Sequence, residues 1–83
     1  MDIDCQKVIR VLGLRCNWEQ RVPVPDDHQL AFALKSAGLS ENLSFLCMEE
    51  LLKNRYIIKE SAGYKLTDKG YDYGYRKRHD PIE

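Results

Sequence analysis

The sequence contains three cysteines and two histidines, the residue types that most often supply nucleophiles, proton shuttles or metal ligands. Cys5, Cys16 and Cys47 lack the close paired spacing of a zinc ribbon or of a CxxC redox motif. Their spacing follows the apolar positions of the expected helices, so we interpret them as free thiols of a core. His28 and His79 lie far apart in the sequence, and we expect both to be solvated.

Paired carboxylates and phosphate-binding loops are not found in the sequence either. Glu49 and Glu50 are adjacent, and neighbours on a helix point about 100° apart, so they do not form a paired acid and base. The sequence has no Gly-rich phosphate loop and no nucleophile elbow. We therefore predict a protein that is not an enzyme, with no catalytic residues, no cofactor and no metal site.

Length and charge restrict the remaining classes of protein. The chain has 83 residues, with 13 Lys or Arg and 13 Asp or Glu, and this neutral balance argues against a generic polyanion binder. The length favours one domain, which we place at residues 1–76, followed by a flexible tail of basic and acidic residues at 77–83. No apolar run approaches the roughly 20 residues that span a bilayer, and no secretory leader precedes the domain. We expect a cytoplasmic protein without a membrane partner.

A first helix and an extended segment are predicted at the start of the domain. Apolar residues from Cys5 to Cys16 recur at spacings of three and four, which is typical of an amphipathic helix. Asp2 or Asp4 can cap its N-terminus. Residues 21–25 then contain two prolines, which hold the backbone extended, so this segment is a connector or a short edge strand.

Two further helices follow, joined by a tight turn. We expect the second helix to begin at Asp26, which forms a capping box with Gln29, and to end at Gly38 in the left-handed conformation. Ser40 is a suitable N-cap for a third helix that continues through Asn54. The short connection between them is typical of a helix-turn-helix.

The apolar period then changes from 3.6 to 2, which predicts a β-hairpin with strands at residues 56–60 and 64–67 around a turn at 61–63. Thr67 can cap a fourth helix.

Tyr71 and Tyr75 share one side of that helix and are expected to pack on the domain, which leaves Tyr73 the freest of its tyrosines. Gly70 and Gly74 should weaken the helix by roughly 1 kcal/mol each relative to alanine.

Two local motifs resemble a known family. Residues 48–57, MEELLKNRYI, look like the end of the third helix of a winged helix-turn-helix domain as it enters the wing. Residues 64–70, YKLTDKG, resemble the second wing strand and the next helix start in small prokaryotic and phage winged-helix proteins. The order of elements over residues 2–75 is similar as well. Arg55 departs from the glycine that is usual at the end of the third helix, so we expect Asn54 to take the left-handed conformation instead.

The resemblance implies an α+β, mainly helical fold with a three-helix core, a two-stranded wing and a C-terminal helix. It also implies DNA binding and transcription regulation, with the third helix in the major groove and the wing on the backbone. The residues that would contact nucleic acid are Asn42, Lys53, Lys59, Lys65, Lys69, Arg76, Lys77 and Arg78.

The chemistry of the third helix favours an alternative. A helical wheel places Ser44, Cys47, Met48 and Leu51 inward and Asn42, Leu43, Phe45, Leu46, Glu49 and Glu50 outward. Residues 26–54 carry two bases against five acids, a net charge of −3, whereas residues 55–83 carry seven bases against five acids, or +2. An apolar and acidic helix face is unsuited to phosphates.

We therefore keep open a protein-interaction module that does not bind DNA and uses Leu43, Phe45, Leu46, Glu49 and Glu50. Those apolar groups could be covered within the monomer, in a homodimer or by another protein.

Overall fold

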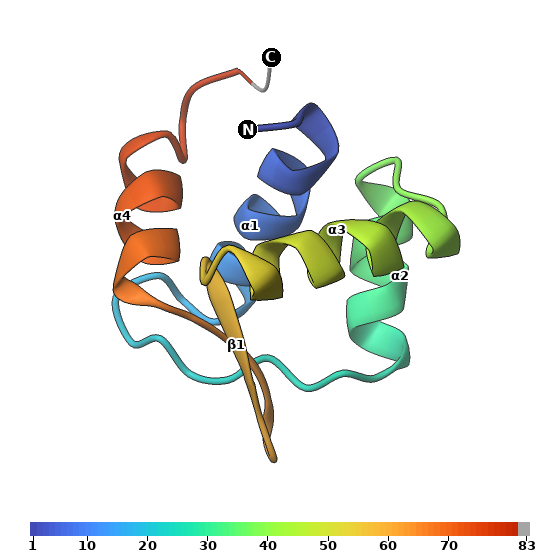
Figure 1. Ribbon diagram of the computed structural model, residues 1–83, viewed down its shortest axis with the longest axis horizontal. Helices are drawn as coiled ribbons and strands as arrows, with labels where there is room; N and C mark the ends of the chain where they lie inside the picture. The colour runs from blue at the N-terminus through green and yellow to red at the C-terminus, as the bar shows by residue number, and fades with distance from the viewer. Residues whose placement is uncertain (82–83) are drawn as a thin grey trace.

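The computed structural model describes residues 1–81, which form four helices and one two-stranded antiparallel sheet (Figure 1). The fold is therefore α+β and mainly helical, as the sequence predicts. The order of helices and hairpin is compatible with a winged-helix-like arrangement. The elements are α1 (Ile3–Arg15), α2 (His28–Ser36), α3 (Glu41–Lys53), β1 (Ile57–Glu60), β2 (Gly63–Leu66) and α4 (Asp68–Arg76).

Short polar side chains begin the helices. The Ser40 hydroxyl accepts a hydrogen bond from the Leu43 amide at 3.2 Å, so the predicted cap of α3 is confirmed. The prediction that Asp26 begins α2 is wrong by one residue. The Asp27 carboxylate accepts from the amides of Gln29 and Leu30 at 3.0 and 3.2 Å, because only a cap two or three residues before these amides can reach them.

The end of α3 also differs from the prediction. Arg55, not Asn54, takes the left-handed conformation, with φ of +62°. The Asn54 backbone stays near the helix with φ of −90°, and its side-chain amide donates to the Glu50 carbonyl oxygen at 3.0 Å. The Tyr56 amide donates to the Leu51 carbonyl at 2.9 Å, which closes a Schellman motif around Arg55. These bonds offset the cost of placing a residue with a Cβ there.

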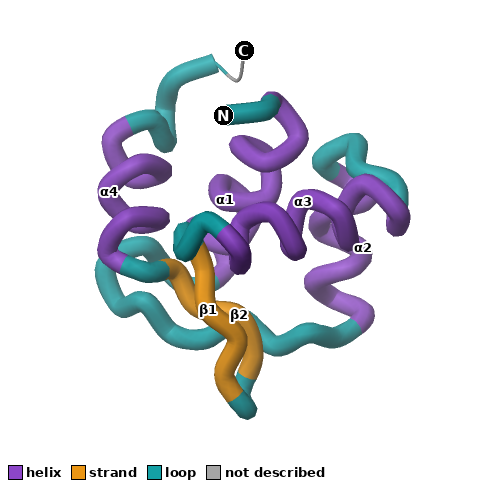
Figure 2. The backbone as a smooth tube through the Cα atoms, viewed as in Figure 1, coloured by secondary structure: helices purple, strands orange, loops and turns teal. Residues whose placement is uncertain are grey.

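The hairpin is confirmed, with a turn shorter than predicted. Ile57 pairs with Leu66 and Glu60 with Gly63, so the turn is residues 61–62 and Gly63 belongs to β2 (Figure 2). Val24 adds an isolated bridge to the other edge of β2, with N–O distances of 2.7 and 2.9 Å to Tyr64. The segment at 21–25 is thus a one-residue edge strand. Gly63 has φ of +135°, and a Cβ there would overlap the Val24 backbone.

Helix α1 is the centre of the packing, since it contacts the three other helices and β2 (Figures 1 and 2). All three cysteines are buried free thiols, as predicted. The core consists of Cys5, Val8, Ile9, Leu12, Cys16, Trp18, Val24, Leu30, Leu34, Leu39, Cys47, Met48, Leu51, Ile57 and Leu66.

Trp18 is a core residue that the sequence patterns do not reveal, because it follows α1 and belongs to no periodic stretch. Its ring lies between Gly13 of α1 and Gly74 of α4, and a Cβ on either glycine would overlap the indole. The Trp18 ring meets Tyr71 and Tyr75 edge-to-face at centroid distances of 6.5 and 6.1 Å. Gly74 therefore has a packing role that helix propensity alone does not indicate.

Candidate functional site

The outer face of α3 is the most apolar exposed part of a helix in the described chain. Leu43, Phe45 and Leu46 have exposed fractions of 40%, 65% and 62%. The predicted wheel is confirmed, because Cys47, Met48 and Leu51 are buried and Ser44 is half-buried. The outer face of α3, defined as Asn42, Leu43, Phe45, Leu46, Glu49 and Glu50, is exposed at every one of these positions.

The apolar surface continues onto α2. A groove of about 230 Å³ lies between α2, α3 and the hairpin, with Phe45 on its wall and Asp26 and Glu41 as its carboxylates. Glu41 also lines a neighbouring hollow beside Phe32, whose exposed fraction of 72% is the largest of any large apolar side chain described. The two hollows thus share a wall, and acidic groups border the apolar surface.

Nothing in residues 1–81 covers this surface. Helix α4 packs on α1 and β2, so it does not reach the outer face of α3. The alternative in which the monomer covers Leu43, Phe45 and Leu46 is therefore wrong for the described chain. The inward side of α4 packs against Trp18 and β2 instead.

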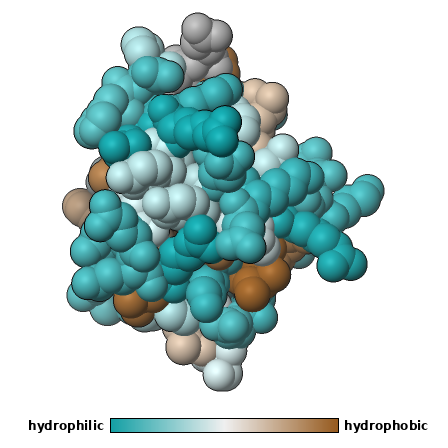
Figure 3. Space-filling view, turned by 90° about the vertical axis from the view of Figure 1, so that its left-hand side faces the viewer, coloured by the Kyte–Doolittle hydropathy of each residue, from teal (hydrophilic) through white to brown (hydrophobic). Residues whose placement is uncertain are grey.

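The side of the molecule that carries α4 has a different character. Figure 3 shows this side: it is largely hydrophilic, with side chains of intermediate hydropathy at its centre. Cations lie over tyrosine rings here, with Lys69 Nζ 4.3 Å from the Tyr56 centroid and Lys77 Nζ 4.5 Å from the Tyr73 centroid. The Arg78 guanidinium lies 3.6 Å from the centroid of the Tyr75 ring. These are cation–π contacts.

Tyr73 is not the free side chain that the sequence indicates. It is half-buried and meets Tyr56 edge-to-face at 5.8 Å, so it belongs to the packing of α4 on the domain. Tyr71 and Tyr75 stack at 5.0 Å, and their predicted packing role is confirmed. Lys69 of α4, and Lys77 and Arg78 just after it, are thus held against aromatic rings, whereas Arg76 pairs with Asp72.

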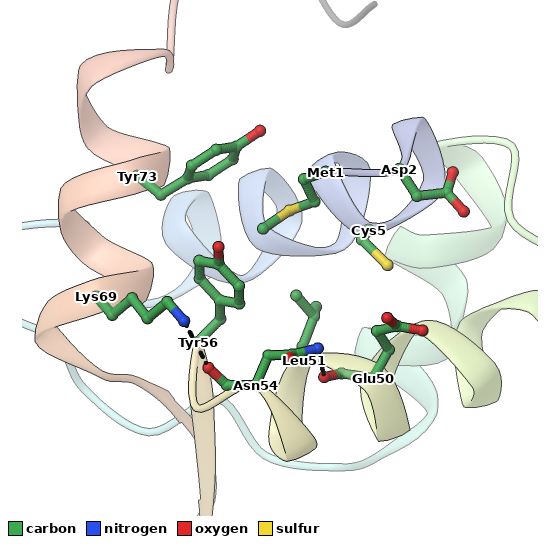
Figure 4. Close-up of a pocket in the computed structure, with 9 residues that line it drawn as sticks. All are labelled: Met1, Asp2, Cys5, Glu50, Leu51, Asn54, Tyr56, Lys69 and Tyr73. Atoms are coloured by element: carbon green, nitrogen blue, oxygen red, sulfur yellow. Dashed lines mark hydrogen bonds between the residues drawn. The ribbon is translucent and has the colours of Figure 1, made fainter.

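A cleft lies where the start of α1, the end of α3 and α4 meet (Figure 4). Its volume is about 350 Å³, and Asp2 and Glu50 line the end away from α4. A second hollow of about 330 Å³, lined by Asp72, Arg76 and Lys77, adjoins it. The two hollows share the side chains of Tyr56, Lys69 and Tyr73, so they adjoin along these residues and form a pair with an acidic and a basic end. We call this the α4 cleft.

The structure brings some of the predicted nucleic-acid residues together and separates others. Lys69, Arg76 and Lys77 line the same hollow, and Arg78 follows them in sequence.

The other four lie apart. Asn42 and Lys53 are exposed near opposite ends of α3, roughly 16 Å apart at 1.5 Å per residue. Lys59 and Lys65 point to opposite faces of the hairpin, since they are paired with Tyr64 and Ile58.

The buried thiols are not reactive groups. Burial, together with a hydrogen bond with the Cys47 thiol, raises the pKa of Cys5 to about 12. Burial also raises the pKa of Cys16 and of Cys47. A thiol with a raised pKa stays protonated at neutral pH and is a poor nucleophile or metal ligand.

Comparisons with known proteins found no matching family model, no similar curated protein and no similar solved structure. Within residues 1–81, no helix has both the length and the apolar character needed to cross a membrane. The same residues hold no group of three or more His, Cys, Asp or Glu side chains placed to bind a metal ion. A functional conclusion therefore depends on the outer face of α3 and on the α4 cleft.

Proposed function

We propose that this protein is a winged-helix module that docks a protein partner on the outer face of α3, and that the partner offers an amphipathic helix with lysines or arginines. The observation that carries the proposal is the exposure of Leu43, Phe45 and Leu46 on one side of a single helix. Leu43 and Leu46, three residues apart, share a face of α3, and Phe45 lies at its edge on the wall of the adjoining groove, so an amphipathic helix could lay its apolar side across them. Burying them would supply the driving force for association.

The charges around this surface select the partner. Glu41, Glu49, Glu50 and Asp26 border the apolar groups, and all four are exposed. They outnumber the two lysines on the same border, Lys35 and Lys53, although Asp26 also lies 3.8 Å from Lys59. A second copy of the chain would bring the same carboxylates opposite one another, which is unfavourable, whereas a basic helix would pair with them. The partner is therefore a basic amphipathic segment rather than a second copy.

The same face is poorly suited to reading DNA. Leu43, Phe45 and Leu46 have no side-chain hydrogen-bonding groups for base edges, and Glu49 would repel phosphates. Asn42 is the one residue of this face with a side chain that commonly reads bases. The winged-helix scaffold would thus be used for a protein partner.

A direct test uses two labelled model helices, one built from leucine and lysine and the other from leucine and glutamate, with binding followed by fluorescence anisotropy. We expect the basic helix to bind and the acidic one to bind about tenfold more weakly or not at all. Leu46→Lys should weaken binding of the basic helix by about tenfold. Leu14→Lys is the matched control, since Leu14 is exposed to 67% on α1 and lies off the docking face.

Two results would contradict this proposal. Equal loss of binding in Leu46→Lys and Leu14→Lys would show that the outer face of α3 is not the docking surface. Sedimentation that shows self-association of the wild type, abolished by Leu46→Lys, would make a second copy the occupant instead of a basic helix.

Duplex DNA is a second candidate partner, favoured by the cations of the hairpin and α4 rather than by α3. Residues 55–83 have a net charge of +2, and Lys59, Lys69, Arg76 and Lys77 are exposed. Contacts of this kind go to phosphates and weaken steeply with salt. Absence of duplex binding at ~50 mM salt would eliminate this candidate.

A further inference from the structure

We propose that the α4 cleft binds a nucleoside phosphate, with the phosphate on the cations of α4 and the base toward Asp2 and Glu50. The proposal uses none of the apolar side chains of the outer face of α3 and does not rest on the docking function. The juxtaposition that carries it is a pair of adjoining hollows with cations at one end, carboxylates at the other, and Tyr56 and Tyr73 shared between them. Figure 4 shows Lys69, the two tyrosines and the carboxylates.

The basic end is suited to a phosphate. Lys69, Arg76 and Lys77 line it with one carboxylate, Asp72, which accepts from Arg76 Nε at 3.1 Å. Within residues 1–81, neither the Lys69 nor the Lys77 ammonium lies within 4.0 Å of a carboxylate. Both can therefore donate to phosphate oxygens without giving up an ion pair.

The tyrosines hold these ammonium groups at the wall of the cleft. Lys69 Nζ donates to the Asn54 carbonyl oxygen at 3.0 Å and lies over Tyr56, and Lys77 lies over Tyr73 (Figure 4 for Lys69). Restricting both side chains before binding lowers the entropy lost when a phosphate arrives. The half-buried rings also offer aromatic surface on which a base can pack.

The acidic end is suited to the amino groups of a base. Figure 4 shows the Asp2 and Glu50 side chains on the far side of the cleft from Tyr73 and Lys69. One Asp2 oxygen accepts from the Asp4 amide at 3.1 Å, which leaves the other oxygen able to accept. Carboxylates accept hydrogen bonds from exocyclic amino groups such as those of adenine and cytosine.

The polarity and size of the cleft select this ligand class. Inorganic phosphate would leave the acidic end unmatched, and a simple amine would leave the basic end unmatched. The adjoining hollows of about 350 and 330 Å³ are at the lower end of the range for small-ligand sites, roughly 300–1,000 Å³. The nucleoside phosphate could be a free nucleotide or one nucleotide of a single strand, because both present the same phosphate and base.

The experiment is an amide-resolved NMR titration with adenosine monophosphate, pyrophosphate and a short single-stranded oligoadenylate. We expect adenosine monophosphate to shift the signals of α4 and of residues 54–56 saturably. Lys77→Gln should weaken its binding about tenfold, through the loss of one charge-assisted hydrogen bond. Lys35→Gln is the matched control, because Lys35 is exposed on α2 and does not line the α4 cleft.

A second variant separates the two ends of the cleft. Glu50→Gln should weaken binding of adenosine monophosphate but not of pyrophosphate, which has no base. Oligoadenylate binding of similar strength to the mononucleotide would identify a free nucleotide as the ligand. Much tighter oligoadenylate binding with the same loss in Lys77→Gln would identify a single strand, and both results support the proposal.

Three results would overturn it. One is the absence of saturable shifts in α4 with any of the probes. Another is equal weakening in Lys77→Gln and Lys35→Gln, which would reduce the effect to net charge. The third is that pyrophosphate binds as tightly as adenosine monophosphate and Glu50→Gln changes neither, which would leave a phosphate site without a base site. None of these outcomes bears on helix docking at Leu46, so failure of one proposal is distinguishable from failure of the other.

Discussion

The outer face of α3 and the α4 side of the molecule are both accessible, but they differ in whether their exposed side chains have partners within the chain. On α3, apolar side chains project without partners from a helix whose other side is fixed in the core. On the α4 side, Lys69 and Lys77 lie over tyrosines that are themselves half-buried. We propose that the first surface provides apolar area for association and that the second positions charges for a ligand. Net charge alone therefore does not distinguish these two surfaces.

The largest expected effect tests whether the outer face of α3 is free in solution. Leu51→Ala and Leu46→Ala delete the same atoms from the same helix, at exposed fractions of 1% and 62%. We expect Leu51→Ala to lower the free energy of unfolding by ~3 kcal/mol, because it leaves a cavity. Leu46→Ala should change it by less than ~0.5 kcal/mol. Urea denaturation measures both. A loss near that of Leu51→Ala in the Leu46 variant would show that this face is buried in an assembly.

A somewhat smaller effect tests how α4 is held. Helix propensity alone predicts that Gly70→Ala stabilises the protein by ~1 kcal/mol. The structure predicts the opposite sign, because a Cβ on Gly70 would overlap the backbone carbonyl of Tyr56. We expect a destabilisation of ~2 kcal/mol in urea denaturation.

Asp72→Ala is the control for Gly70→Ala on the same helix, since it removes only an exposed ion pair with Arg76 and should cost less than ~0.5 kcal/mol. A stabilised Gly70→Ala protein would mean that α4 does not pack closely against Tyr56. That result would also contradict the α4 cleft, which is lined by Tyr56 and residues of α4.

The smallest expected effect concerns the floor of the α4 cleft. The pKa of Cys5 is raised to about 12 from an ordinary value of 9.0, so the unfolded chain loses this proton at a lower pH than the folded protein does. The resulting stability is fully present below pH 9 and is lost as the pH rises toward 12.

At pH 10 the Cys5 contribution should be reduced by about 1 kcal/mol relative to pH 8. The measurement is the difference between wild type and Cys5→Ala in urea denaturation at the two pH values, which removes the titration of lysines and tyrosines common to both. The same pH dependence in the variant would show that solvent reaches Cys5 through the cleft.

The sequence predicted the elements well where local rules decide them. Ser40 and Thr67 cap α3 and α4, and the period of α3 identifies its outer face, because these features depend on residues three or four positions apart. The errors at Asp26 and Arg55 are shifts of one residue at helix ends, where adjacent polar residues compete for the same hydrogen bonds.

The candidate sites were less accessible to sequence patterns. The apolar surface of α3 could be predicted from its wheel, whereas the α4 cleft could not, because it combines residues from the two ends of the chain. Tyr73 is an example. Its position on the helix predicts an exposed side chain, and only its edge-to-face contact with Tyr56 makes it part of the packing of α4.

The helices, the hairpin, and the inward and outward sides of α3 could all be predicted from the sequence, since each depends on short-range periodicity and capping. Only the packing of the elements places Trp18 against Gly74 and lets Arg10 donate to the Lys77 carbonyl oxygen. The physical reason is distance along the chain. Contacts between residues more than 50 positions apart depend on how whole elements pack, and local spacing carries no record of that packing.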